Sequence, residues 1–171
     1  MGFLAPLQRS YIFMTNAAER PVNGRTDQAD TLTGVITFVA KQAKSFYDAK
    51  PDGDWPMTIF AFSPTGCHVL QTHFNVTRRE ETYAAFSEAF KELGVESYVV
   101  ASEAWAGRKG STTPPFMQAD RREILLITAV DMTGTATMTM DITRNRKGKV
   151  IKLTPGVIAR DGAGPLTELL A

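Results

Sequence analysis

The segment Thr135–Thr143 alternates polar and apolar side chains almost perfectly. Ala136, Met138, Met140 and Ile142 fall on one face of an extended chain, and the threonines with one aspartate fall on the other. A strand that packs one face on a core and leaves the other uncovered shows this pattern, which is typical of antiparallel sheets. The segment therefore predicts a half-exposed antiparallel strand. Its threonine face meets either solvent or a neighbouring subunit.

Other stretches combine strand-forming residues with turn residues at their ends. A turn at residues 63–66, with a proline at its second position, joins the first two stretches into a hairpin. The stretch 123–130 is apolar on both faces, which predicts a central strand. Besides the alternating segment, the predicted strands are Met57–Phe62, Cys67–Phe74, Val95–Trp105, Glu123–Val130 and Lys149–Leu153.

Two segments show the spacing of apolar residues that an amphipathic helix requires. The first is Gln28–Tyr47, for which Asp27 or Asp30 is a candidate N-cap. The second begins with the capping box Thr77–Glu80, in which hydroxyl and carboxylate satisfy each other's backbone amides. It ends before Gly94, which suits the left-handed residue after a last helical turn.

This order of elements predicts one α+β domain over residues 1–171. Two amphipathic helices should pack on a mainly antiparallel sheet of about five or six strands. The connection through the second helix is a candidate parallel crossover. The ends are less regular: residues 1–26 fit either a helix or an edge strand, and 154–171 are rich in glycine and proline, with a short helix predicted at Pro165–Leu170.

Composition removes several classes of function. The 171 residues include 19 lysines and arginines against 18 aspartates and glutamates, so the net charge is +1. Bulk charge therefore does not favour a nucleic-acid binder. No stretch approaches the ~20 apolar residues of a membrane span, and the first residues do not resemble a signal peptide. We expect a cytoplasmic protein without membrane partners, and a virion is the alternative location.

Cysteine and histidine are scarce in this sequence. Cys67 is the one cysteine, and His68 and His73 are the two histidines. On a single strand the two histidines point to opposite faces, so the three residues cannot bind one metal ion. The G-x-S-x-G elbow, the phosphate-binding P-loop and the H-E-x-x-H motif are all missing. We therefore predict no metal, no cofactor and no catalytic residue, with Cys67 packed in the core.

Glu103 is the best candidate for chemistry, since it shares a strand face with Ala101 and Trp105. A carboxylate among apolar neighbours has a raised pKa and can serve as an acid or base in a pocket. In the alternative interpretation, Glu103 pairs with an arginine across the sheet, such as Arg121 or Arg122.

The loop Gly107–Ala119 carries an adjacent pair of large apolar residues, Phe116 and Met117. Such a pair in a surface loop is either a docking element for a partner or a segment that folds back onto the core. Trp105 precedes this loop, so Glu103, Trp105, Phe116 and Met117 are the candidate binding residues.

A basic turn lies between the last two predicted strands. Its residues are Arg144, Arg146, Lys147, Lys149 and Lys152, and Arg108 with Lys109 forms a smaller cluster. These residues are candidates for phosphate contacts with nucleic acid. The alternative is a solvated hairpin tip whose charges discourage edge-to-edge pairing. No aromatic residue between 143 and 153 offers a surface on which a base could stack.

The segment Ser102–Trp105, with its E-A-W motif, is followed by a proline-containing loop and Arg121–Glu123. In these residues the middle third of the chain resembles small uncharacterised α+β proteins of bacteria and their phages. This resemblance implies no known activity and transfers no catalytic residue. The order of helices and strands also resembles profilin-like and roadblock-like domains, which implies only a fold that often serves interaction.

These observations favour a non-catalytic assembly or interaction protein, such as a component of a phage virion. The expected partner is a further copy of the chain or another protein, and nucleic acid is less favoured. One alternative is a small enzyme or ligand-binding protein with a pocket near Glu103 and Trp105. A weaker alternative is nucleic-acid binding through the turn 144–152.

Overall fold

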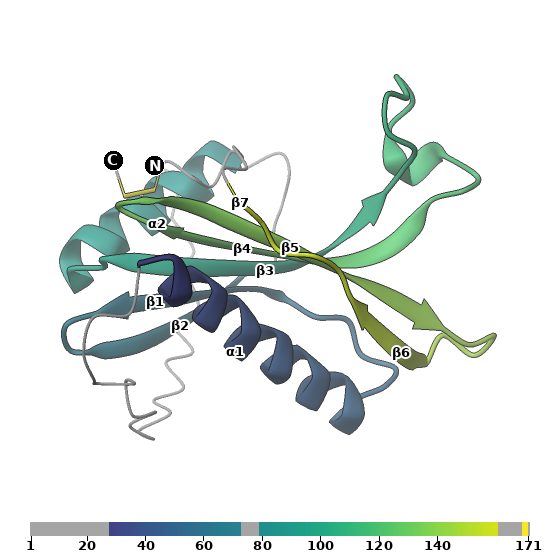
Figure 1. Cartoon of the computed structure of the whole chain (residues 1–171), viewed down its shortest axis with the longest axis horizontal. Coiled ribbons are helices and arrows are strands. Elements are labelled where there is room, and N and C mark those ends of the chain that lie inside the picture. The colour runs from purple at the N-terminus through teal and green to yellow at the C-terminus, as the bar shows by residue number, and fades with distance from the viewer. Residues whose placement is uncertain (1–27, 73–78, 161–168, 171) are drawn as a thin grey trace, which may run out of the picture.

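Seven strands form one sheet in the computed structural model, which describes residues 28–72, 79–160 and 169–170 (Figure 1). The strand order is β2-β1-β3-β4-β5-β6, and β7 pairs with β5 beside β6. The strands are β1 (Met57–Ser63), β2 (Gly66–Thr72), β3 (Ser97–Ala106), β4 (Arg122–Asp131), β5 (Gly134–Arg144), β6 (Val150–Pro155) and β7 (Ala159–Arg160). The helices are α1 (Gln28–Ala49) and α2 (Arg79–Leu93), with a short 3₁₀ helix η2 (Pro115–Met117). The predicted α+β domain is confirmed.

Every pair of neighbouring strands is antiparallel. Since β2 and β3 both run antiparallel to β1, they are parallel to each other, and α2 connects them. The predicted crossover is therefore present and passes over β1. The strand predicted as central from its apolar faces is β4, which lies between β3 and β5.

The two helices cover opposite faces of the sheet. Ile36 and Val39 of α1 belong to a buried cluster with Leu125 and Ile127 of β4. Phe86 and Phe90 of α2 belong to a second cluster with Ile59 of β1 and Tyr98 of β3. Along β1 the residues alternate between the clusters, because successive side chains of a strand point to opposite faces. The sheet thus separates two hydrophobic cores, which we call the α1 core and the α2 core after the helix that each contains.

The alternating segment behaves as its pattern predicts. In β5, Ala136, Met138, Met140 and Ile142 are buried and pack in the α1 core. The threonines of the same strand are exposed or half-buried. Gly94 also adopts the predicted left-handed conformation, with a φ of 63° at the end of α2.

The C-terminal part of the chain differs from the prediction. Residues 154–160 were expected to be irregular, but β6 continues to Pro155 and Ala159–Arg160 form β7. A two-residue strand has no period that a sequence pattern could show. The expectations for 1–26, for His73, for the Thr77 capping box and for most of Pro165–Leu170 lie outside the described residues. In the part of the chain that the structure describes, no helix has the length and apolar character to cross a membrane.

Tyr98 makes the fold less stable at alkaline pH. Its side chain is fully buried in the α2 core, and burial raises its pKa to about 12 from the usual 10, although a backbone hydrogen bond with Leu169 acts in the opposite direction. A group with a higher pKa in the folded state holds its proton more tightly there than in the unfolded chain. This contribution is therefore complete below pH 10 and is lost as the pH rises toward 12.

We predict that the titration of Tyr98 lowers the free energy of unfolding by about 2–3 kcal/mol as the pH rises from 10 to 12. Urea denaturation across this range measures the loss, and the Tyr98→Phe variant should show a correspondingly smaller decline. The comparison uses the slopes, since the variant also loses a hydrogen bond at every pH. Parallel curves for the two proteins would contradict the prediction.

Candidate functional site

The end of β3, the start of β4 and the loop between them form an arm that projects from the sheet (Figure 1). We define this β3–β4 arm as residues 104–123. Within it, Ala106 pairs with Arg122 and Trp105 with Glu123, whereas β5 pairs with β4 only as far as Ile124. The arm therefore extends beyond the strands that support the rest of β4.

Gln118 organises the loop of the arm from within. Its Oε1 accepts a hydrogen bond from the backbone N of Arg108 at 2.7 Å, and its Nε2 donates to the carbonyl of Thr113 at 2.6 Å. Gly107 makes room for this side chain, because a Cβ added there would lie 2.4 Å from Nε2 of Gln118. One amide side chain thus joins both sides of the loop and its middle.

Arg121 and Arg108 fix the tip of the arm further. The guanidinium of Arg121 donates to the carbonyl of Phe116 and lies 4.6 Å above the centre of the Trp105 ring, within the range of a cation–π interaction. Arg108 forms an ion pair with Asp120 at 3.0 Å. The loop is therefore ordered by its own contacts.

Three large apolar side chains of this ordered arm remain exposed. Trp105 is 45% exposed, Phe116 58% and Met117 65%. The alternative in which Phe116 and Met117 fold back onto the core is therefore wrong for this structure. The arm presents both of them, with Trp105 nearby, to the surroundings.

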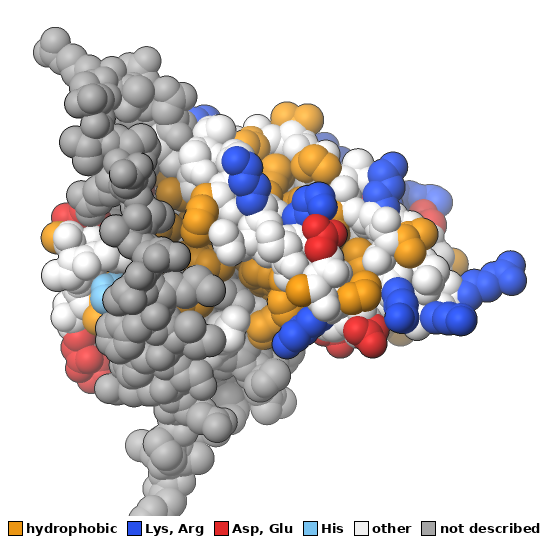
Figure 2. Space-filling model, turned by 90° about the horizontal axis from the view of Figure 1, so that it is seen from below, with side chains coloured by type: hydrophobic (Ala, Val, Ile, Leu, Met, Phe, Trp, Pro, Cys, Tyr) orange, Lys and Arg blue, Asp and Glu red, His pale blue; other side chains and the backbone are white. Residues whose placement is uncertain are grey.

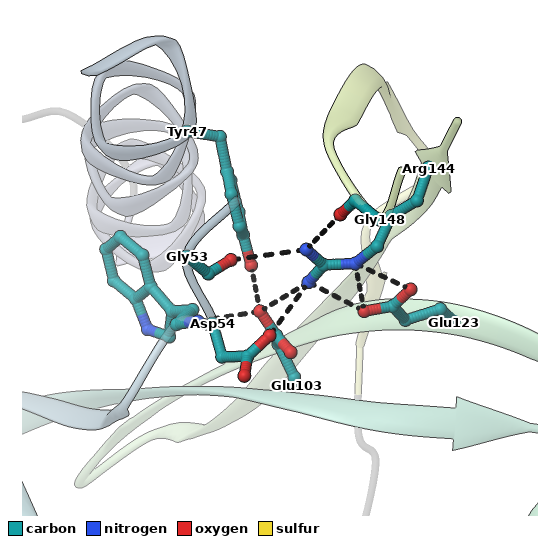
Figure 3. Close-up of polar contacts among 8 residues, drawn as sticks. Tyr47, Gly53, Asp54, Glu103, Glu123, Arg144 and Gly148 are labelled. Carbon is teal, nitrogen blue, oxygen red and sulfur yellow. Dashed lines mark hydrogen bonds and ion pairs between the residues drawn. The ribbon is translucent and has the colours of Figure 1, made fainter. Parts of the chain in front are cut away.

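At the base of the arm, Arg144 lies with its side chain only 17% exposed, among carboxylates and carbonyls from distant segments (Figure 3). Its Nε donates to both carboxylate oxygens of Glu123, at 2.9 and 3.0 Å. Its Nη1 donates to the carbonyls of Gly53 and Gly148, and its Nη2 reaches Asp54 at 3.3 Å. Every nitrogen of the guanidinium is thus hydrogen-bonded. Burial acts to lower the pKa of Arg144, but its partners, with Glu123 first among them, together raise it.

Glu103 belongs to the same cluster, so the alternative interpretation, in which Glu103 pairs with an arginine, is confirmed. Its Oε1 accepts hydrogen bonds from the hydroxyl of Tyr47, from the backbone N of Trp55 at 2.6 Å and from Arg144 at 3.4 Å. Burial, followed by the contact with Glu103, raises the pKa of Tyr47, so its hydroxyl stays protonated and donates. The carboxylate of Glu103 is therefore engaged by protein groups.

The arginine that pairs with Glu103 was predicted wrongly. The prediction named Arg121 or Arg122, but Arg121 stacks on Trp105 and Arg122 pairs with Asp141 at 2.8 Å. The partner is Arg144, which belongs to the basic turn and was a candidate either for phosphate contacts or for a solvated hairpin tip. Because Arg144 points inward, it does not share the exposure of Arg146, Lys147 and Lys149.

Strand parity carries a signal for this cluster that the sequence interpretation used for Glu103 but not for Glu123 or Arg144. Arg144 is two residues beyond Ile142, so it continues the buried face of β5. Glu103 and Glu123 likewise share parity with Ala101 and Leu125, which both face the α1 core. The partners Asp54 and Tyr47 lie outside the sheet, and no pattern in the sequence pointed to them.

Other candidate residues lie away from this cluster. Cys67 is exposed on the edge strand β2, so its predicted place in the core is wrong. His68 makes a hydrogen bond of 3.0 Å with Ser63 within the β1–β2 hairpin. Among the described residues, no group of histidine, cysteine, aspartate and glutamate side chains is arranged to hold a metal ion.

The chain was compared with protein-family models, with curated proteins and with solved structures, and none of them matches. The geometry provides two features: a structural cluster around Arg144 at the base of the arm and an exposed apolar tip at its end.

We predict that Arg144→Met lowers the free energy of unfolding by about 3 kcal/mol, because Glu103 and Glu123 would lose their shared positive partner while half-buried. Urea denaturation measures the change. Arg122→Met is the matched control, since its ion pair with Asp141 is well exposed and should contribute less than about 1 kcal/mol. Equal losses in the two variants would show that the Arg144 cluster has no special role.

We predict that Gln118→Ala disorders the loop of the arm without lowering global stability by more than about 1 kcal/mol. Amide hydrogen exchange should accelerate at Arg108, and trypsin should cleave faster after Arg108 and Lys109. Gly107→Ala should give the same result, because its added Cβ displaces the Gln118 side chain. Unchanged exchange in both variants would mean that Gln118 does not hold the loop.

Proposed function

We propose that this chain is a non-catalytic interaction protein that binds another protein through the tip of its β3–β4 arm. One observation supports the proposal above all: an internally ordered loop holds Trp105, Phe116 and Met117 exposed. Tryptophan, phenylalanine, methionine and arginine are the residue types enriched at protein interfaces, and Arg121 lies beside them on Trp105.

The order of the loop lowers the entropic cost of binding a partner. A flexible loop would lose conformational freedom on binding, and that entropy would weaken the complex. The contacts of Gln118, Arg121 and Arg108 restrict the loop before any partner arrives. The Arg144 cluster adds a rigid base, since Glu123 at the start of β4 is bound to it. Such a preorganised apolar tip is what an anchor at the centre of an interface requires.

The two alternative functions have weaker support. The carboxylate of Glu103 is engaged by Tyr47, Trp55 and Arg144, so a pocket that uses it as an acid or base would first have to displace protein donors. Nucleic-acid binding keeps Arg146, Lys147 and Lys149 as exposed candidates but loses Arg144. A place in a phage virion stays a prediction of the sequence resemblance.

Capture of partners by matched variants tests the proposal. Tagged wild-type protein is cross-linked in the cells that make it, and the captured proteins, further copies of the chain included, are quantified by mass spectrometry. Phe116→Ser combined with Met117→Ser should reduce a specific partner at least about tenfold, through loss of an interface anchor. The control combines Ile151→Ser with Val157→Ser, which removes two apolar residues exposed at 64% and 88% outside the arm.

The control variant should retain the partner, because general surface stickiness would depend on any exposed apolar residue. Circular dichroism should show both variants folded, since none of the four residues is buried. If the arm variant captures every partner as well as the wild type does, the arm is not the binding site and the proposal is overturned.

A further inference from the structure

The nearly neutral charge of the chain conceals a separation of charge along the sheet. Exposed glutamates outnumber the one exposed lysine, Lys91, along α2 and the turn after it: Glu80, Glu81, Glu88, Glu92 and Glu96. Exposed lysines and arginines occupy the arm and the β5–β6 turn: Lys109, Arg146, Lys147, Lys149 and Lys152. Figure 2 shows blue Lys and Arg side chains gathered at the end of the molecule where the β5–β6 turn projects, and an acidic group at the opposite end.

The topology places these two groups at opposite ends of the same strands. α2 leads directly into the start of β3, where Ser97 pairs with Asp131 beside the β4–β5 turn. β3 and β5 then run from this end to the arm and to the β5–β6 turn. We call the first the acidic end (Glu88, Glu92, Glu96 and Met132) and the second the basic end (Lys109, Arg146, Lys147, Lys149 and the arm tip).

In the part of the chain that the structure describes, ion pairs do not neutralise the charges that define the two ends. In the described ranges, no ion pair within 4.0 Å involves Glu92, Glu96, Lys147 or Lys149. Like charges that crowd one end repel each other, and an oppositely charged surface relieves that repulsion. Each end is therefore complementary in charge to the other end of the same molecule.

The acidic end also presents an exposed apolar side chain on an ordered turn. Met132 is 81% exposed at the β4–β5 turn. The carboxylate of Asp131 holds this turn by accepting hydrogen bonds from the backbone N of Thr133 at 2.7 Å and of Gly134 at 3.2 Å. Met132 thus offers an apolar contact for the Phe116 and Met117 side chains of an arriving arm.

We propose that the partner of the arm is a second copy of this chain, bound head to tail, with the basic end of one copy on the acidic end of the next. The inference rests on the proposed function for its apolar contact and adds the identity of the partner. A two-fold dimer through either end would bring like charges together, so head-to-tail contact is the arrangement that the charges favour. Such a contact uses two different surfaces, and it therefore builds rings or filaments.

Charge reversal at each end, followed by mixing, tests this proposal. Sedimentation velocity of the wild type at low salt should show association that weakens as salt screens the contact. Lys147→Glu with Lys149→Glu should raise the dissociation constant at least about tenfold, and so should Glu92→Lys with Glu96→Lys. An equimolar mixture of the two variants should associate again, since the reversed basic end of one complements the reversed acidic end of the other.

A matched control carries the same change of charge on α1. Lys41→Glu with Lys44→Glu alters two exposed lysines outside the residues that define either end and should leave association unchanged, although Lys44 also loses its ion pair with Asp48. Loss of association in this control as well would attribute the effect to net charge and would overturn the proposal. A wild type that stays monomeric at all concentrations and salts would overturn it too, as would a mixture of the two reversed variants that fails to associate.

The Phe116→Ser, Met117→Ser variant separates this proposal from the proposed function. If the wild type is monomeric but the arm variant loses capture of a different protein, the self-contact is wrong and the proposed function stands. If the wild type associates and the arm variant associates equally well, the charged ends meet without the arm tip. In that case the proposed function fails, and with it the contact of the arm tip with Met132.

Discussion

The hydrogen bonds and ion pairs of the Arg144 guanidinium hold together the end of the sheet from which the arm projects. Two hydrophobic cores hold the helices on the sheet, but neither core includes a residue of the arm, which begins where β3 and β4 leave the support of β5. There, Arg144 joins the α1–β1 loop, β4 and the β5–β6 turn through Asp54, Glu123 and Gly148. An ammonium group could not replace it, because only the planar fork of arginine directs five N–H donors toward separate acceptors.

The elements with a strong period were predictable from the sequence, and the contacts between them were not. β5 and α1 follow the residue alternation and the helical spacing, which depend on neighbours within one segment. That the helices cover opposite faces was not predictable, because an apolar stripe does not state which side of a sheet it meets. β7 is too short to show any period.

The candidate site divides in the same way. The sequence predicts Trp105, Phe116 and Met117 as apolar residues in or beside a surface loop. Their exposure depends on hydrogen bonds of Gln118, and no local sequence pattern indicates those bonds. The run of positive charges predicts Arg144 as part of a basic turn, whereas strand parity places it on the buried face of β5. A polar residue on the buried face of a strand must find partners, and that constraint identifies Arg144 more directly than its charge does.

The order of the arm comes from contacts among its own residues, which has a consequence for how the chain can change over time. Residues 115–117 contribute nothing to either hydrophobic core. Substitutions there should therefore cost little in folding. Under the proposed function, the residues that set affinity for a partner differ from the residues that hold the fold, so selection could act on one property without loss of the other.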